Sequence, residues 1–264
     1  MKRLTAVAAL LVTHASASFA HDTWIMCTPP VIESSAPVSL HVTSGMAFPA
    51  FDTAPKPERI KHCQWRIGGK QGSFSEFQTD DPASLVVAGR VHTDGVAVIY
   101  AEFHPKEIDL QPDEVTHYLD EIGAPEGVRR AIEKAGAGAT FHETYTKHAK
   151  TYLRVGEKGD ATGCLGPVGF AIDFLPDRDP TTLKVGDTLT IKVIRGGDEL
   201  SGYSVGTVGG TGKTSMQRTN QNGMVTVEIT APGWWLVRGT ELRQKADGTW
   251  ESDFTTLTFF VGNP

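Results

Sequence analysis

The chain has 264 residues and a mass of 28.5 kDa, with 28 Gly, 15 Pro and a formal net charge of −6. This length excludes a disulfide-stapled miniprotein, and the ordinary hydrophobic content of 39% excludes wholesale disorder. The acidic balance argues against nucleic acid as a partner, because proteins that bind it usually present a basic face to the phosphates. The many Gly and Pro residues favour a protein rich in β-turns.

Residues 1–20 are typical of a secretory signal peptide. A basic start at Lys2 and Arg3 precedes a short apolar run, and Ala20 follows two residues after Ser18 at the expected cleavage point. The apolar run is too short to span a membrane, so no membrane insertion is expected after cleavage. We therefore expect an exported protein, most simply one of a bacterial periplasm, with a mature chain beginning at His21.

A terminal histidine has a specific chemistry. Its free α-amine and its imidazole can together chelate one metal ion, and Cu(II) and Ni(II) favour such nitrogen-rich sites. Asp22 adds a carboxylate next to it. His41, on the polar side of a predicted strand, is a further candidate ligand, although an incidental His at the terminus explains the same residues.

The segment from His21 to about residue 105 is predicted to be β. Apolar and polar residues alternate in Val38–Val42, and similar runs follow at Ile60–Ile67, Ser84–Val87 and Val96–Phe103. Cys27 and Cys63 lie in two strand-like segments of this part and could form a disulfide in an oxidising compartment, leaving Cys164 alone; three isolated buried thiols are the alternative.

Residues 106–150 are predicted to be a helical insertion or bridge. Pro112–Val115 opens a helical pattern that Gly123 and Pro125 interrupt, and Gly127–Ala135 resumes it. A further helix is expected over Glu143–Tyr152, because Glu143 and Lys147 are four residues apart.

From residue 151 to residue 264 the pattern is again β. Alternating runs occur at Thr188–Val193, Val225–Ile229, Trp234–Arg238 and Thr255–Val261. The glycine-rich stretch Gly206–Thr214 lacks the phosphate-loop spacing and is interpreted as a β-hairpin loop. The sequence thus predicts a mainly β protein with two immunoglobulin- or transthyretin-like sandwiches, at residues 21–105 and 151–264, joined by the helical insertion.

Several motifs resemble one family over essentially the whole mature chain. They are the opening His21–Ile25, the middle motif Lys147–Gly156, the segments Pro167–Gly169 and Asp173–Pro176, and the C-terminal patterns Gly233–Thr240 and Trp250–Phe259. The family is the periplasmic proteins of unknown function often labelled nickel-uptake-transporter family proteins.

This resemblance implies handling of nickel or cobalt alongside a membrane transporter component, and a C-terminal half like small immunoglobulin modules. It carries over His21 as a ligand. Many members have a His near the position of Glu241, and a carboxylate there is a harder ligand than imidazole.

We therefore expect a non-catalytic metal-binding or delivery protein for nickel, cobalt or copper, with His21, Asp22, His41 and Glu241 as candidate ligands. A non-catalytic interaction module with an incidental terminal His is the main alternative. A copper-dependent oxidative enzyme is a further one, and it would need a second His beside His21.

Overall fold

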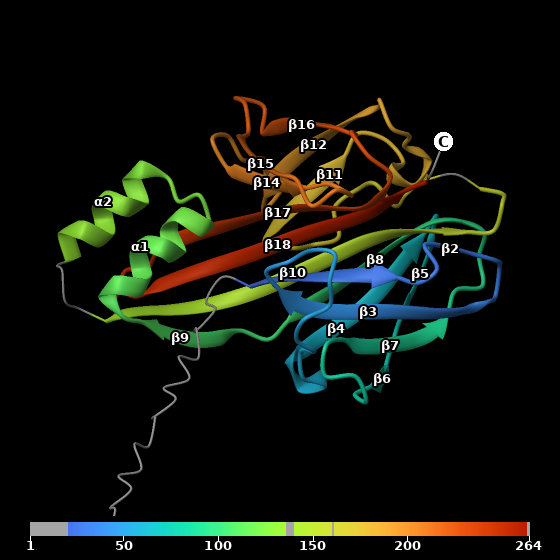
Figure 1. Cartoon of the computed structure of the whole chain (residues 1–264), viewed down its shortest axis with the longest axis horizontal. Helices are drawn as coiled ribbons and strands as arrows, with labels where there is room; N and C mark the ends of the chain where they lie inside the picture. Colours follow the sequence, from blue (N-terminus) through green and yellow to red (C-terminus); the bar gives the residue numbers. More distant parts are fainter. Residues whose placement is uncertain (1–20, 136–139, 160, 263–264) are drawn as a thin grey trace, which may run out of the picture.

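A computed structural model of the chain describes residues 21–135, 140–159 and 161–262 (Figure 1). The predicted signal peptide, residues 1–20, lies outside the described residues. Among the described residues, no helix is both long and apolar enough to cross a lipid bilayer.

The prediction of a mainly β protein is confirmed, with two short helices among the described residues. The strands are β1 (Asp22–Cys27), β2 (Val31–Ile32), β3 (Pro37–Gly45), β4 (Ile60–Ile67), β5 (Lys70–Ser73), β6 (Glu76–Gln78), β7 (Leu85–Arg90), β8 (Gly95–Phe103), β9 (Lys106–Leu110), β10 (Phe141–Val155), β11 (Ile172–Pro176), β12 (Thr188–Arg195), β13 (Asp198–Glu199), β14 (Ser204–Val208), β15 (Thr214–Arg218), β16 (Met224–Glu228), β17 (Gly233–Gln244) and β18 (Trp250–Val261). The helices are α1 (Pro112–Glu121) and α2 (Glu126–Ala135), and short 3-10 turns lie at η1 (Pro57–Arg59) and η2 (Pro180–Thr182).

Three sheets form within the described residues. The N-terminal sheet has the antiparallel order β1-β3-β7-β6, and the C-terminal sheet has β11, β12, β13 and β16 around β12. The central sheet has the order β15-β14-β17-β18-β10-β8-β4-β5, and β2 and β9 also pair with β10. The N-terminal and C-terminal sheets pack on opposite faces of the central one (Figure 1).

The long strands β10 and β18 form the middle of the central sheet and run parallel to each other. Side chains of β10 therefore alternate between two cores. Leu153 and Ala149 join the core under the N-terminal sheet, whereas Tyr152 joins the core under the C-terminal sheet. The division into domains at residues 105 and 150 stays a prediction, and β10 itself runs across residue 150.

The helix expected over Glu143–Tyr152 is wrong, because this segment is part of strand β10. The segment is rich in Thr and Tyr, which favour strands, and it has strand neighbours on both sides. Helices α1 and α2 do match the predicted patterns. The Gly206–Thr214 stretch is confirmed as part of a hairpin, formed by β14 and β15.

The three cysteines are free and buried, so the expected Cys27–Cys63 disulfide is not formed. Cys27 and Cys63 instead belong to the same apolar core as Leu40 and Ile99. Burial raises the pKa of each thiol to about 12, which keeps the side chains neutral and unreactive.

Among the described residues, strand β1 is paired with another strand on one edge only, and side chains of the central sheet donate hydrogen bonds to its other edge. β3 pairs with one edge of β1. On the other edge, the Thr256 hydroxyl donates to the carbonyl oxygen of Thr23, and the Thr258 hydroxyl donates to that of Ile25. These threonine hydroxyls therefore join the N-terminal sheet to the central sheet.

We expect Thr258→Val to lower the free energy of unfolding by about 1–3 kcal/mol, because it leaves the buried Ile25 carbonyl without its donor. Chemical denaturation with urea measures this change. Thr226→Val, at an exposed position of β16, is the matched control and should leave stability nearly unchanged. Equal stability of both variants would contradict this role of Thr258.

Candidate functional site

His21 stands at the start of β1, and its backbone is held by a lysine from the central sheet. The Lys147 ammonium, on β10, donates to the His21 carbonyl oxygen at 2.6 Å. This contact extends the row formed by Thr256 and Thr258, because carbonyls two residues apart point to the same edge of a strand. The described part of the chain therefore begins at a fixed position.

Asp22, the residue after His21, is held in place by an ion pair. The Arg238 guanidinium, on β17, donates from Nη1 to Oδ2 of Asp22 at 2.7 Å, and both side chains are half-buried. This pair links the first strand of the described chain to one of the last. It fixes the direction in which the chain enters β1.

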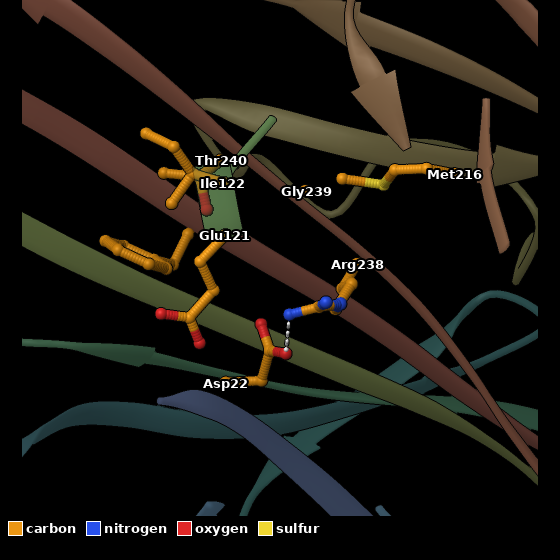
Figure 2. Close-up of a pocket in the computed structure, with 8 residues that line it drawn as sticks. Asp22, Glu121, Ile122, Met216, Arg238, Gly239 and Thr240 are labelled. Carbon is orange, nitrogen blue, oxygen red and sulfur yellow. Dashed lines mark hydrogen bonds and ion pairs between the residues drawn. The ribbon is translucent and has the colours of Figure 1, made fainter. Parts of the chain in front are cut away.

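A small pocket opens next to Asp22 (Figure 2). It encloses about 250 Å³, its open mouth included, and its lining residues are Asp22, Glu121, Ile122, Met216, Arg238, Gly239, Thr240 and Phe254. Figure 2 shows the Glu121 carboxylate, at the end of α1, next to that of Asp22. Oε1 of Glu121 is buried and has no hydrogen-bond partner among the described residues.

Asp52 packs over Gly45, the β3 residue that is paired with the start of β1. Gly45 pairs with Asp22 across β1 and β3, and a Cβ on Gly45 would lie 2.7 Å from Cβ of Asp52. Glycine is therefore required where the Asp52 side chain folds back over this strand end. The Asp52 carboxylate is close enough to His21 to act on its imidazole.

Burial and the surrounding charges shift the titration of this cluster. Burial and the Lys147 charge lower the pKa of His21, and the carboxylates of Asp52 and Asp22 oppose that shift. Burial also lowers the pKa of Lys147 to about 8. Burial raises the pKa of Asp22 against the effect of Arg238, and burial and the neighbouring Asp22 raise that of Glu121. The cluster thus favours a neutral imidazole, the form that binds metal ions.

The expected ligands do not gather as one group. Among the described residues, no cluster of three or more His, Cys, Asp and Glu side chains is placed to hold a metal ion. His41 lies opposite Met26, four residues along β1 from Asp22, which is about 14 Å at the rise of a strand. Its Nδ1 is 3.1 Å from the Ser84 hydroxyl, and its ring stacks on Phe51.

Glu241 belongs to a separate network on the other face of β17. It lies three residues from Arg238, and residues an odd number apart in a strand point to opposite faces. Its carboxylate pairs with Arg195 at 2.5 Å and with Arg243, and Arg243 also pairs with Asp253 at 2.6 Å. This carboxylate therefore already has two cationic partners.

Sequence reasoning found His21 and Asp22 but missed Asp52, Glu121, Lys147 and Arg238. Each missed residue comes from a different segment of the chain, and only the sheet pairing brings them to the start of β1. Within the sequence, Arg238 and Lys147 stood in motifs that the resemblance had singled out, but nothing local indicated what they would contact.

Comparison with known proteins places the sequence in a family without giving it a function. The family described as "Domain of unknown function (DUF4198)" matches residues 18–240, which is most of the chain. This confirms the expected resemblance to a family of unknown function, and the nickel label forms no part of the match. No curated protein matches the sequence.

Solved structures resemble the chain only weakly. A solved chain of a 1.5-MDa bacterial ice-binding adhesin is 12% identical, with a TM-score of 0.26 over 92% of this chain and 65% of that one. A Ca²⁺-stabilised adhesin of an Antarctic bacterium is 13% identical, with a TM-score of 0.25 over 92% of this chain and 49% of that one. Fibronectin(III)-like modules of Clostridium thermocellum CbhA are 9% identical, with a TM-score of 0.21 over 90% and 94%. This chain thus spans about two thirds of the first solved chain and about half of the second, and similarity at this level carries no argument about function.

The position of Lys147 predicts an unusual titration. We expect its Cε resonance in the NMR spectrum of ¹³C-lysine-labelled protein to titrate near pH 8, far below an ordinary lysine, because burial disfavours the ammonium. Lys147→Arg identifies the signal by removing it. The lowered pKa also means that the folded state gains stability as pH rises from about 8 toward 10.5. A spectrum in which every lysine titrates near 10.5 would rule out this environment.

Proposed function

We propose a metal-binding function for this chain, which belongs to the DUF4198 family. The mature protein, beginning at His21, binds one divalent transition metal ion outside the cytoplasm. The α-amine and the imidazole of His21 supply two nitrogen ligands, and the Asp52 carboxylate supplies an oxygen. Nickel, cobalt and copper are the candidate ions, since all three accept mixed nitrogen and oxygen ligands.

One observation carries this proposal: His21 is a positioned residue. Lys147 holds its carbonyl, and the Asp22–Arg238 ion pair holds the residue that follows. A terminus fixed in this way loses little further freedom when it binds an ion, which favours affinity. The burial that lowers the pKa of His21 supports the same function, because a metal competes with a proton for the imidazole.

The charges around His21 favour one ion of modest charge. Asp22 and Asp52 bring carboxylates, and Arg238 already neutralises that of Asp22. Lys147 adds a positive charge that opposes a cation, although its lowered pKa weakens this charge above about pH 8. Asp22 positions the terminus through Arg238 rather than serving as a ligand, and His41 and Glu241 lie too far along their strands or on another face.

Delivery to a membrane transporter component is the wider role that we propose for such a protein, with no catalytic turnover. An interaction module remains the alternative, and it would be favoured by a continuous apolar patch. The large apolar side chains exposed among the described residues are Val31, Met46, Val185 and Met216, which lie on separate segments. A copper enzyme would require a second histidine beside His21.

Calorimetric titration of Ni(II), Co(II) and Cu(II) into protein with an authentic His21 terminus tests the proposal. We expect one ion to bind per chain. One Ala added before His21 should weaken binding about tenfold or more, which is at least about 1.4 kcal/mol, because the α-amine leaves chelating reach. Equal binding by both proteins, or no binding by either, would refute the terminal chelate.

The oxygen ligand is tested separately. Asp52→Asn should lower the affinity while keeping one ion per chain, since a carboxamide is a weaker ligand than a carboxylate. Asp198→Asn, an exposed substitution on β13 with the same change of charge, is the matched control. An Asp52→Asn variant that binds as tightly as the control would remove Asp52 from the ligand set.

A further inference from the structure

Helix α1 forms one wall of the pocket beside Asp22. Glu121 and Ile122, at the end of the helix, line the pocket, and the Ser204 hydroxyl on β14 donates to the next carbonyl, that of Gly123, at 2.6 Å. The inner face of the helix presents Val115, Tyr118 and Leu119 to the apolar core that Phe141, Leu242, Trp250 and Phe254 complete. The contacts that hold α1 on the central sheet therefore also determine the shape of this pocket.

A buried carboxyl group, that of Glu143, stands within this otherwise apolar contact. Glu143 lies on β10 and is 2% exposed. Its Oε1 accepts hydrogen bonds from the Tyr118 hydroxyl of α1, at 2.8 Å, and from the Ser252 hydroxyl of β18. Its Oε2 is buried and has no partner among the described residues. Ionisation would thus place a charge on an oxygen that nothing solvates.

No basic side chain of the described residues offsets this carboxyl group. Burial raises the pKa of Glu143, and the two hydroxyl donors lower it. Burial is the larger effect, so the pKa is raised overall. The titratable groups that interact with this carboxyl group are Tyr118 of α1 and Tyr145 of β10. β18 presents Ser252 and β9 presents Ile108.

We propose that Glu143 is a pH-dependent latch for helix α1. When its carboxyl group is protonated, the Tyr118 and Ser252 hydroxyls hold it in the apolar contact and α1 packs on the central sheet. When the group ionises, the buried charge destabilises that contact, so α1 loosens and the pocket wall at Glu121 and Ile122 moves from Asp22. The effect on metal binding rests on the proposed function, whereas the latch itself does not.

The direction of the pH effect follows from the raised pKa. An unfolded glutamate titrates near 4.5, so the folded state binds a proton that the unfolded state has released between this pH and the folded pKa. Stability from Glu143 is therefore complete below about pH 4.5 and is lost as pH rises through the folded pKa. Between about pH 4.5 and the folded pKa, the opening equilibrium of α1 should increase by up to about tenfold per pH unit, and it should level off above the folded pKa.

Hydrogen exchange of residues 112–122, measured by mass spectrometry from pH 5 to pH 9 and corrected for intrinsic rates, tests the latch on the full mature chain. We expect protection of α1 to fall with rising pH in the native protein. In Glu143→Gln, which mimics the neutral acid, protection should stay constant over this range. Glu107→Gln, an exposed neighbour on β9, is the matched control and should behave as the native protein does.

Two results would overturn the latch: protection of α1 that does not change with pH, or the same pH dependence in the native protein and in Glu143→Gln. Should Glu143→Gln not fold, Tyr118→Phe provides the second variant, and it should exchange faster already at pH 5 because one donor to Glu143 is gone.

Nickel titrations of the native protein and of Glu143→Gln at pH 6 and pH 8 test whether the latch affects metal binding. If the ratio of the two proteins' nickel affinities is the same at both pH values, this coupling is refuted. If neither protein binds nickel, the proposed function is refuted and the latch is unaffected.

Discussion

The rest of this structure depends on how one unpaired strand edge is satisfied. β1 hydrogen-bonds to β3 on one side only, and its other edge faces the central sheet. The carbonyls of His21, Thr23 and Ile25 accept hydrogen bonds from Lys147, Thr256 and Thr258. Buried carbonyls without donors would each cost about 1–3 kcal/mol, so these side chains allow the N-terminal sheet to pack face-on against strands that do not pair with it. The same row of contacts extends to His21, next to the start of β1.

The last contact of this row differs in kind from the first two. A threonine hydroxyl is neutral, whereas Lys147 brings a charge to the end of β1, beside Asp22, Asp52 and Arg238. Holding this strand edge therefore places a charged side chain at the start of β1, next to His21. The pocket beside Asp22 is small, about 250 Å³ with its mouth.

The local sequence pattern predicted most of the secondary-structure elements and two residues of the candidate site, His21 and Asp22. The alternation in β3, β4, β8 and β12 and the helix signals at Pro112 identified elements whose own sequence agrees with their environment. The pattern failed for Glu143–Tyr152, where ion-pair spacing suggested a helix but strands on both sides impose an extended chain. Asp52 and Arg238 could not be assigned in advance, because their contacts depend on sheet pairing between segments far apart in the sequence.

The proposed chelate and the proposed latch respond to pH in opposite directions. A metal ion needs the α-amine and the imidazole of His21 deprotonated, so rising pH favours binding. Rising pH also ionises Glu143, which loosens α1 and the pocket wall that carries Glu121. Together, the two proposed effects should make metal affinity rise less steeply with pH than the chelate alone would. With Glu143→Gln only the first effect remains, and affinity then rises with pH until His21 is fully deprotonated. The shape of this single curve therefore separates a terminal chelate that acts alone from one that is coupled to helix α1.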